Sequence, residues 1–410
     1  RVCRAHNFVE YVVPTLQPTE LFVEKSGPEI VGQLFNFTDK GGREVTLPAE
    51  ATPYLAHMVG AKAAALKRPI KWFSIPECFR YERPQKGRTR SFYQLNADIF
   101  DEAGVAAELE LISLTVDVFR GFGLTQEDFA LRLSDRTLWL NFLAALGYEG
   151  QSAMSVLSII DKWERESPEE ILKKLQTLAG NNATDLQTKL GEMMKLTSLA
   201  AIVEFMQKNL SKASAEAQAV VTARLELWKE LLGDIEAAGI ADYVRVDLGI
   251  VRGLAYYTGF VFEVFEVKRP SRALAGGGRY DNLVEKLGGP KMPAMGMGLG
   301  DVTLIDLLRD SGKLPSFAES VDFYLIYTSP ATRKAALRLS GVIRDAGRSA
   351  EVAAKAGNIG KGLKNADKAG ASKAIIIGDD ELAKGIAKLK CLRSGDEREI
   401  PLKATAVELE

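Results

Sequence analysis

The sequence is poor in the residues that build metal centres and disulfide frameworks. Its three cysteines, Cys3, Cys78 and Cys391, are far apart and odd in number. This argues against paired disulfides and against a zinc site, and it fits a reducing compartment. The two histidines, His6 and His57, are too few for a histidine-rich metal cluster. A solitary histidine is more often a surface or packing residue than a catalyst, and we prefer that interpretation for both.

Long apolar runs and a strong net charge are also missing. No stretch of about twenty apolar residues occurs, so no transmembrane helix is predicted, and no signal-peptide pattern is present. The net charge of -1 provides no global basic field, so any RNA binding has to use local patches. With 410 residues, 46% of them hydrophobic and 26% charged, the chain has the composition of a globular protein of about two to three domains. We expect a cytoplasmic protein without membrane contact.

Residues 79–98 have the pattern of a basic β-hairpin with one polar face. Strand side chains alternate between the two faces of a sheet. In both runs of this segment, the apolar side chains fall on one face of the expected strand and mostly polar side chains fall on the other. The mostly polar face consists of Cys78, Arg80 and Glu82 before the loop, and Phe92, Gln94, Asn96 and Asp98 after it.

The loop of this hairpin carries four cations in eight residues. The string RPQKGRTR holds Arg83, Lys86, Arg88 and Arg90, with proline and glycine as turn formers. Such a loop beside a polar floor predicts an anionic ligand at one end and a polar ligand at the other. The residues alone support a solvated basic surface hairpin equally well.

Three segments resemble one enzyme family. The pattern FR-x-E, basic loop, R-x-F resembles motif 2 of class II aminoacyl-tRNA synthetases, and ERPQKGR followed by F-x-Q-L resembles the histidyl-tRNA synthetase family. Residues 251–263 (VRGLAYYTGFVFE) are similar to the histidine-site signature of that family, and residues 275–289 (AGGGRYDNLVEKLGG) are similar to its glycine-rich companion. Three such segments in the order of the family are a much stronger signal than one glycine-rich loop.

The resemblance implies ATP as a substrate, with Mg²⁺, and no tightly bound metal held by the protein. In amino-acid activation a carboxylate attacks the α-phosphate and pyrophosphate leaves, so fixed cations and alignment are needed, whereas a catalytic base is not. Arg80 and Arg252 match the two catalytic arginines at the α-phosphate. Glu82 matches a residue near the adenine, Arg88 one at the distal phosphates, and Phe92 the ring that stacks on adenine.

The resemblance also implies a binding site for L-histidine. Glu50 and Thr52 match the motif that holds the α-amino group, and Asp98 and Tyr257 match the contacts to the two ring nitrogens. A site that bonds both nitrogens rejects apolar isosteres by roughly 10⁴-fold or more. The glycines at 276–278 would let the backbone approach the ligand closely. The full implied set is Glu50, Thr52, Gln94, Asp98, Arg252, Tyr256 and Tyr257.

Two positions depart from the family pattern. Motif 3 usually ends in Gly-Leu-Glu-Arg, with the arginine on the ATP phosphates, but GMGLGDVTL places Thr303 where that arginine would be. Asp301 nearby cannot substitute for it. The string LPAEAT replaces the usual LRPEGT, so that Pro48 stands in place of an arginine.

We predict an α+β fold, in which a class II antiparallel sheet flanked by helices carries a helical insertion and is followed by a C-terminal α/β anticodon-binding domain. The expected boundaries are 1–133 for the first part of the catalytic domain, 134–242 for the insertion, 243–312 for the second part and 321–410 for the C-terminal domain. The insertion is interpreted either as a structural cap or as a cover over bound tRNA. The C-terminal domain is mildly basic, which the family resemblance connects with RNA.

Periodicity and turn residues also predict individual elements. Residues 8–16 form a strand candidate broken by Pro14, which resembles motif 1 at a dimer interface but is equally an edge strand. A hairpin turns at 39–44 and leads to a helix that begins at Glu50 and Thr52. An amphipathic helix is expected over 105–120, and SPEE at Ser167 is a helix start with proline in the first position. After residue 321, strands and helices alternate, with a mainly parallel sheet.

The favoured function is a histidine–tRNA ligase that charges tRNA(His) through histidyl-adenylate and acts as a homodimer. The alternative is a non-catalytic relative that serves as a regulatory subunit in histidine biosynthesis. The missing motif 3 arginine favours this alternative, whereas Arg80, Arg252 and the C-terminal domain count against it. A third interpretation is an RNA-binding module without activity.

Overall fold

The computed structural model describes residues 1–85, 87–251, 256–269, 272–315, 320–403 and 405. Contacts divide the chain into two compact units, Arg1–Leu314 and Pro315–Glu410. Each unit has its own sheet and its own apolar core, and each is described by itself.

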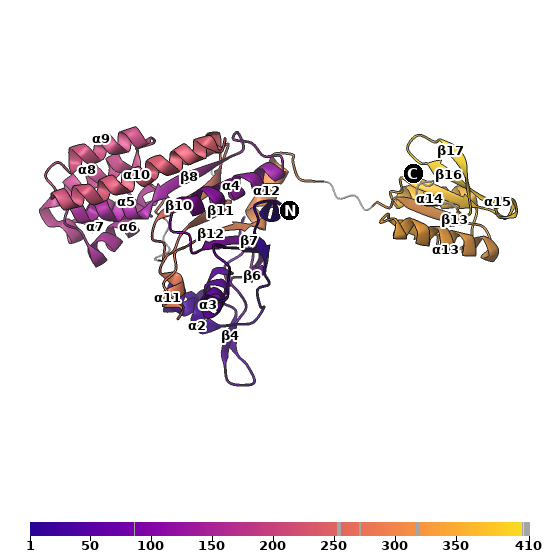
Figure 1. Cartoon of the computed structure of the whole chain (residues 1–410), viewed down its shortest axis with the longest axis horizontal. Coiled ribbons are helices and arrows are strands. Elements are labelled where there is room, and N and C mark those ends of the chain that lie inside the picture. The colour runs from indigo at the N-terminus through magenta and orange to yellow at the C-terminus, as the bar shows by residue number, and fades with distance from the viewer. Residues whose placement is uncertain (86, 252–255, 270–271, 316–319, 404, 406–410) are drawn as a thin grey trace. The chain divides into compact units, whose positions relative to one another are not determined.

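A large, mainly antiparallel sheet forms the centre of the first unit (Figure 1). Its strands are β1 (Val9–Glu10), β5 (Ile70–Ser74), β6 (Glu77–Phe79), β7 (Ser91–Phe100), β8 (Phe129–Asp135), β9 (Val244–Val246), β10 (Phe260–Glu266), β11 (Ala275–Arg279) and β12 (Ala294–Gly300). The order is β1-β5-β7-β12-β11-β10-β8-β9, and β6 pairs with β7 beside this path. The end pairs, β1 with β5 and β8 with β9, are parallel. The predicted sheet flanked by helices is confirmed.

Helices cover both faces of this sheet. On one face α4 (Ala106–Gly121) buries residues such as Leu111 and Phe119 against the apolar alternation of β7. On the other face α2 (Thr19–Ser26), α3 (Thr52–Lys62) and α11 (Leu283–Lys286) pack around Tyr280 and Leu55. The remaining elements of this part are α1 (Val2–Ala5), η1 (Pro28–Gln33), α12 (Asp301–Asp310) and a small sheet of β2 (Gln17–Pro18), β4 (Glu44–Thr46) and β3 (Asn36–Thr38).

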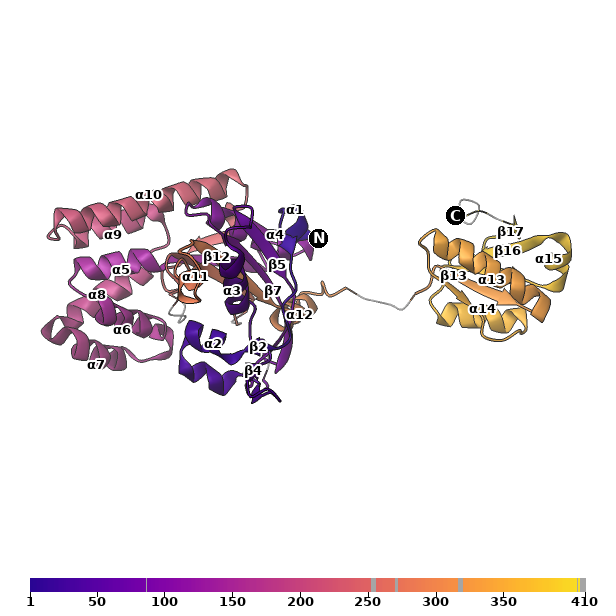
Figure 2. The same ribbon diagram turned by 60° about the horizontal axis from the view of Figure 1, so that its bottom comes forward.

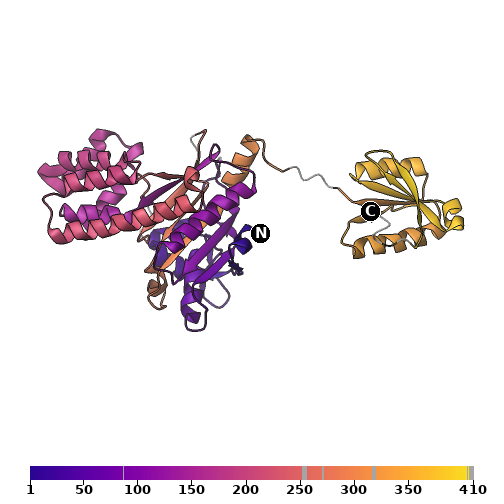
Figure 3. The same cartoon turned by 45° about the horizontal axis from the view of Figure 1, so that its top comes forward.

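A block of helices lies between β8 and β9 in the sequence. Figure 2 shows it gathered at one end of the sheet, and Figure 3 shows the long α10 running from it toward α4, against which it packs. Ser167 forms a capping box with Glu170, and Pro168 occupies the first turn, as predicted. The block comprises α5 (Arg136–Ala145), α6 (Gly150–Ile160), η2 (Trp163–Arg165), α7 (Pro168–Ala179), η3 (Gly180–Asn182), α8 (Ala183–Met194), α9 (Leu199–Asn209), α10 (Ala215–Ala237) and η4 (Ala241–Tyr243).

The second unit is a five-stranded sheet with three helices. Its elements are β13 (Phe323–Tyr327), α13 (Pro330–Asp345), β14 (Ala350–Val352), α14 (Ile359–Lys368), β15 (Lys373–Ile377), α15 (Asp379–Lys384), β16 (Ile386–Cys391) and β17 (Glu397–Pro401). β13 is parallel to β14 and β15, but β16 and β17 add antiparallel pairs. The expected alternation is present through β15, whereas the prediction of a mainly parallel sheet is wrong. The antiparallel pairs of the last hairpin make this sheet mixed.

Three local expectations differ from the structure. The strand expected over 8–16 is limited to the two residues of β1, because only these pair with β5. β8 continues through Asp135, so the helical block begins at Arg136 rather than at residue 134. Glu50 precedes helix α3, which begins at Thr52. Among the described residues, we find no helix with both the length and the apolar character needed to cross a membrane.

One buried carboxylate connects the helical block to the sheet. Asp135 ends β8 with no exposed surface, and its Oδ1 accepts a hydrogen bond of 3.1 Å from the Leu138 N–H at the start of α5. From α10, Arg224 donates to both of its oxygens, at 2.6 and 3.0 Å, and the indole N–H of Trp228 donates at 2.8 Å. These bonds satisfy the carboxylate and place α5 and α10 at the end of β8.

We predict that Asp135→Ala lowers the free energy of unfolding of the first unit by about 3–5 kcal/mol, because it leaves the Arg224 guanidinium largely buried without its partner. Urea unfolding followed by tryptophan fluorescence measures the change. The matched control is Asp185→Ala, which removes an exposed carboxylate paired with Lys189 within α8 and should cost about 0.5 kcal/mol or less. Equal losses for the two variants would contradict the anchoring role of Asp135.

Candidate functional site

The hairpin of β6 and β7 forms one wall and part of the floor of the site. In its register Cys78 lies opposite Phe92, so both side chains are on the same face. Arg80 follows β6 on that face. Its guanidinium lies 5.1 Å from the centre of the Phe92 ring, and its Nε donates to the Ala49 carbonyl at 3.1 Å. The ring and the carbonyl hold the Arg80 side chain against the wall.

Burial raises the pKa of the Cys78 thiol, which lies on the same face of the hairpin. Cys78 has no exposed surface, and desolvation raises its pKa to about 12, although the positive charge of Arg80 acts in the opposite direction.

Glycines on β12 leave room for the polar alternation of β7. Gly298 lies close to Gln94, and a Cβ at this glycine would be 3.0 Å from the amide nitrogen of the glutamine. Gly296 pairs with Asp98, and a Cβ there would be only 2.0 Å from the Asp98 Oδ1. Any other residue at these positions would displace the polar side chains. The predicted alternation of β7 is confirmed from Leu95 to Ile99, whose apolar side chains lie in the opposite core, whereas Tyr93 is exposed.

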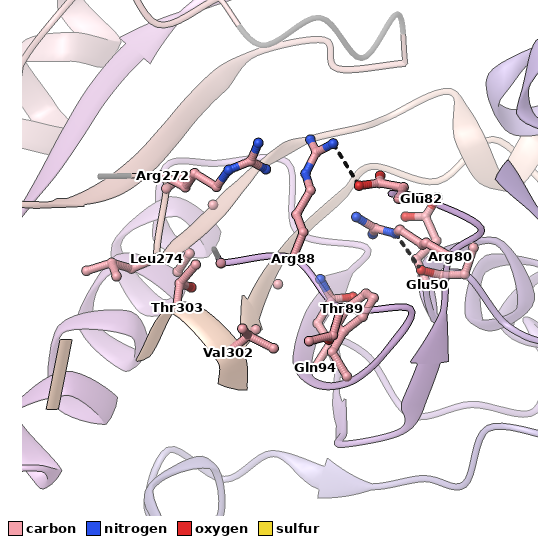
Figure 4. A pocket seen from close by; sticks show the side chains of 18 of the residues that line it. Glu50, Arg80, Glu82, Arg88, Thr89, Gln94, Arg272, Leu274, Val302 and Thr303 are labelled. Atoms are coloured by element: carbon pink, nitrogen blue, oxygen red, sulfur yellow. Dashed lines mark hydrogen bonds and ion pairs between the residues drawn. The ribbon is translucent and has the colours of Figure 1, made fainter. Parts of the chain in front are cut away.

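A cavity of about 890 Å³ opens above this floor (Figure 4). Its size is within the range of small-molecule and nucleotide sites. Six of the residues expected at the ATP and histidine sites line it: Glu50, Arg80, Glu82, Arg88, Phe92 and Gln94. The cavity also has Val302 and Thr303 at the start of α12 in its wall, together with two arginines that the sequence analysis did not select, Arg165 and Arg272.

An ion pair joins the two arms of the basic loop. Arg88 Nη1 lies 2.7 Å from Glu82 Oε2, and an isolated bridge between Gln85 and Arg88 closes the turn. Gly87 at the tip has φ of +75°, a conformation that favours glycine. Lys86 lies outside the described residues.

The other expected histidine contacts that the structure describes do not line this cavity. Thr52 is the first residue of α3, Tyr256 and Tyr257 lie beside or in the core on the α2–α3 face, and Asp98 is 1% exposed. Tyr280 donates its hydroxyl to Asp98 Oδ1, whereas Oδ2 is buried without a hydrogen-bond partner among the described residues. Burial raises the pKa of Asp98 to about 7, opposed by the Tyr280 bond and by the charge of Lys25.

Lys25 connects this buried group with the cavity. Its side chain has no exposed surface, and its ammonium lies 2.5 Å from Glu50 Oε2 and 4.2 Å from the centre of the Tyr256 ring. Because Glu50 also lines the cavity, this partly buried ion pair places a carboxylate between the cavity and the buried Asp98. Tyr256 and Tyr257 stand side by side, with ring centres 4.5 Å apart.

Several of these residues were missed from sequence. Lys25 reads as an ordinary exposed helix lysine, and no local pattern indicates its burial. Tyr280 lies within the glycine-rich segment at 275–289, which would have been a usable signal. Tyr11, whose buried hydroxyl has no hydrogen-bond partner among the described residues, is in the segment read as motif 1. Arg252 and residues 253–255 lie outside the described residues, so the expected pairing of Arg252 with Arg80 stays a prediction.

A second cavity of about 990 Å³ lies between the helical block and the sheet. Arg165 and Glu263 line both cavities, so η2 contributes a cation to the wall of each. At the motif 3 position, Asp301 does not line the first cavity but accepts a hydrogen bond from the Tyr93 N–H at 3.1 Å. The described part of the chain has no cluster of three or more His, Cys, Asp or Glu side chains placed to hold a metal ion.

Comparisons with known proteins cover nearly the whole chain. A family model described as histidyl-tRNA synthetase matches residues 2–302, and one described as an anticodon binding domain matches residues 322–410. A histidine–tRNA ligase of Opitutus terrae is 47% identical over 97% of this chain and 89% of that protein. One from Natronomonas pharaonis is 36% identical over 98% of this chain and 90% of that protein.

Solved structures show the same fold. A histidyl-tRNA synthetase from Nostoc superposes with a TM-score of 0.81 at 22% identity, covering 98% of this chain and 90% of that one. A Bacillus halodurans protein described as an ATP phosphoribosyltransferase regulatory subunit/histidyl-tRNA synthetase reaches 0.72 at 21% identity, over 92% of this chain and 91% of that one. At such identities the likeness shows the fold alone. The two family models and the 47% identity show that the chain belongs to the histidyl-tRNA synthetase family.

Proposed function

We propose that the protein is a histidine–tRNA ligase, which activates L-histidine with ATP and transfers it to the 3′ end of tRNA(His). The observation that carries this proposal is the position of Arg80 over Phe92, in a cavity whose floor continues along β7 through Gln94 to the buried Asp98. The side with Arg80 and Phe92 suits a nucleotide, and the side with Gln94 and Asp98 suits a polar ring. The regulatory-subunit alternative is less supported, because the motif 2 side chains expected to bind ATP are present and the 47% identical relative is a ligase.

In the proposed activation step the histidine carboxylate attacks the α-phosphorus, and the bond to the bridging oxygen of pyrophosphate breaks. Arg80 and Arg252 stabilise the negative charge that gathers on the α-phosphate, since guanidinium groups bind two oxygens and stay charged. Phe92 stacks on the adenine, and Glu82 lies near its edge. Arg88 reaches the distal phosphates, and Mg²⁺ enters as the complex with ATP.

For histidine, Glu50 and Thr52 receive the α-amino group and Gln94 contacts the same end of the substrate. Asp98 accepts a hydrogen bond from one ring nitrogen, with Tyr257 at the other and Tyr256 beside it. The unsatisfied Asp98 Oδ2 supports this role, because a buried acceptor gains most from a ligand donor. The carboxylate would then distinguish imidazole from apolar rings of similar size.

We also propose that the second unit contacts tRNA, as the match to the anticodon binding domain suggests. Its sequence from 321 to 410 has 16 Lys and Arg against 12 Asp and Glu, a local excess of positive charge. Because tRNA charging serves protein synthesis, we propose a cytoplasmic location, which cell fractionation tests.

Amino-acid-dependent exchange between ATP and pyrophosphate tests the proposed function. We expect exchange with histidine alone among the standard amino acids, followed by charging of a tRNA(His) transcript. Arg80→Ala should slow exchange by about 10²- to 10³-fold, the usual effect of removing one preorganised charge donor. Arg43→Ala, at an exposed arginine paired with Asp39 in the β3–β4 hairpin, is the control and should leave it unchanged. No histidine-dependent exchange by the unaltered protein at high concentration would refute the proposal.

The pH dependence of histidine binding tests the role of Asp98. With a pKa of about 7, Asp98 is mostly ionised at pH 8 and mostly neutral at pH 6. If only the ionised carboxylate accepts the ring N–H, the KM for histidine should rise about tenfold over this interval through Asp98 alone. Asp98→Asn should weaken histidine binding at pH 8, and its KM for histidine should no longer show the change between pH 8 and pH 6 that is due to Asp98. Titration of the substrate ring is common to both proteins, so identical profiles would exclude Asp98 as the titrating group.

We propose a homodimer formed through the segment around β1. This segment exposes apolar side chains, with Val12 85% and Leu16 53% accessible, near a two-residue edge strand. Sedimentation velocity should show a dimer at micromolar concentration and a shift toward monomer for Val12→Asp. The control Val220→Asp changes an exposed valine on α10 and should leave the dimer intact. A monomeric parent protein would contradict this proposal.

A further inference from the structure

The wall of the cavity formed by α12 lacks the cation that the family pattern provides. Val302 and Thr303 line the cavity at the first turn of this helix. Neither side chain carries a charge, and Asp301 has the wrong sign for binding phosphate. A triphosphate in this cavity would therefore need a positive charge from another segment of the chain on this side.

Arg272 brings a guanidinium to that side from the segment between β10 and β11. A Cβ placed on Gly87 would lie 3.4 Å from the Arg272 Cδ and 3.5 Å from the Thr303 Cγ2. The stem of Arg272 and the methyl of Thr303 therefore meet over the same glycine, at the tip of the basic loop. Figure 4 shows the guanidinium groups of Arg272 and Arg88 on the same side of the cavity.

Like charges gather around Arg272. Its pKa is lowered, first by desolvation and then by the positive charges of Arg88 and Arg165, while Glu82 acts in the opposite direction. Glu82 is already engaged with Arg88 at 2.7 Å. Arg88, Arg165 and Arg272, from three separate segments, thus line a single cavity. Such a cluster is stabilised when a multiply charged anion binds among its members.

We propose that Arg272 binds the distal phosphates of ATP and takes the role of the missing motif 3 arginine from a different segment. This inference rests on the proposed function. When the bond between the α-phosphorus and the bridging oxygen breaks, its electron pair stays on pyrophosphate. Arg272 stabilises this leaving group together with Arg88, and the contact strengthens as negative charge develops.

The test compares ligands that differ only in their distal phosphates. Arg272→Gln should raise the KM for ATP, and that for pyrophosphate in the reverse reaction, by about 10- to 100-fold, as expected for the loss of charge-assisted hydrogen bonds. The inhibition constant of AMP and the KM for histidine should stay within about twofold, which also shows that the variant is folded. Arg309→Gln removes the same charge from an exposed position on α12 and serves as the control.

Moving the charge back to α12 provides a second measurement. Thr303→Arg in the Arg272→Gln background should restore at least about tenfold of the lost ATP affinity, because the two side chains adjoin over Gly87. If Thr303→Arg restored none of the ATP affinity, the two positions would not be equivalent. An unchanged KM for ATP, or equal weakening of ATP and AMP, would overturn the phosphate role of Arg272.

The role of Arg272 can be tested independently of the proposed ligase function. Equilibrium dialysis with ATP and with AMP measures the same discrimination without any amino acid. If the parent protein bound ATP but showed no histidine-dependent exchange, the proposed function would fail while the role of Arg272 would still be decided. If the ratio of the dissociation constants for AMP and ATP were the same in the unaltered protein and in Arg272→Gln, this inference would be refuted.

Discussion

The site depends on a steric constraint between two neighbouring strands. β7 directs polar side chains to the same face as the helices α2 and α3, and β12 beside it carries glycine where these side chains need space. A floor built in this way is rigid, because both strands are central in the sheet and their other faces are packed against α4. The position of the cavity and of the buried carboxylate both follow from this pairing.

Charge is distributed over the site in two different ways. In the open cavity, guanidinium groups come from the residue after β6, the basic loop, η2 and the segment before β11, and they share the wall with four glutamates. Beside it, Lys25 and Asp98 are buried, and Lys25 pairs with Glu50, which is partly exposed at the edge of the cavity. Burying a charge is costly unless it is paired, so the contact of 2.5 Å with Glu50 stabilises the buried ammonium of Lys25. The first suits a polyanion and the second a small polar molecule.

Sequence reasoning succeeded where the physical signal was local. The alternation in β7, the capping box at Ser167 and the glycine-rich β11 can be read from neighbouring residues. It failed where a contact joins distant segments. The burial of Lys25 depends on Glu50 and Tyr256, and the position of Arg272 depends on the glycine at the tip of the hairpin loop. The strand over 8–16 was overextended because β-propensity does not reveal how many partners a strand finds.

The cysteine beneath Arg80 has a consequence for the handling of the protein. A thiol with a pKa of about 12 is ionised in only about one molecule in 10⁵ at pH 7, and the thiolate is the species that reacts with alkylating agents and peroxide. Packed under the wall of the cavity, Cys78 is further shielded by having no accessible surface. Oxidants and maleimide labels should therefore react first with the partly exposed Cys391 in the second unit. A fluorophore could then be attached there without chemical damage to the floor of the cavity.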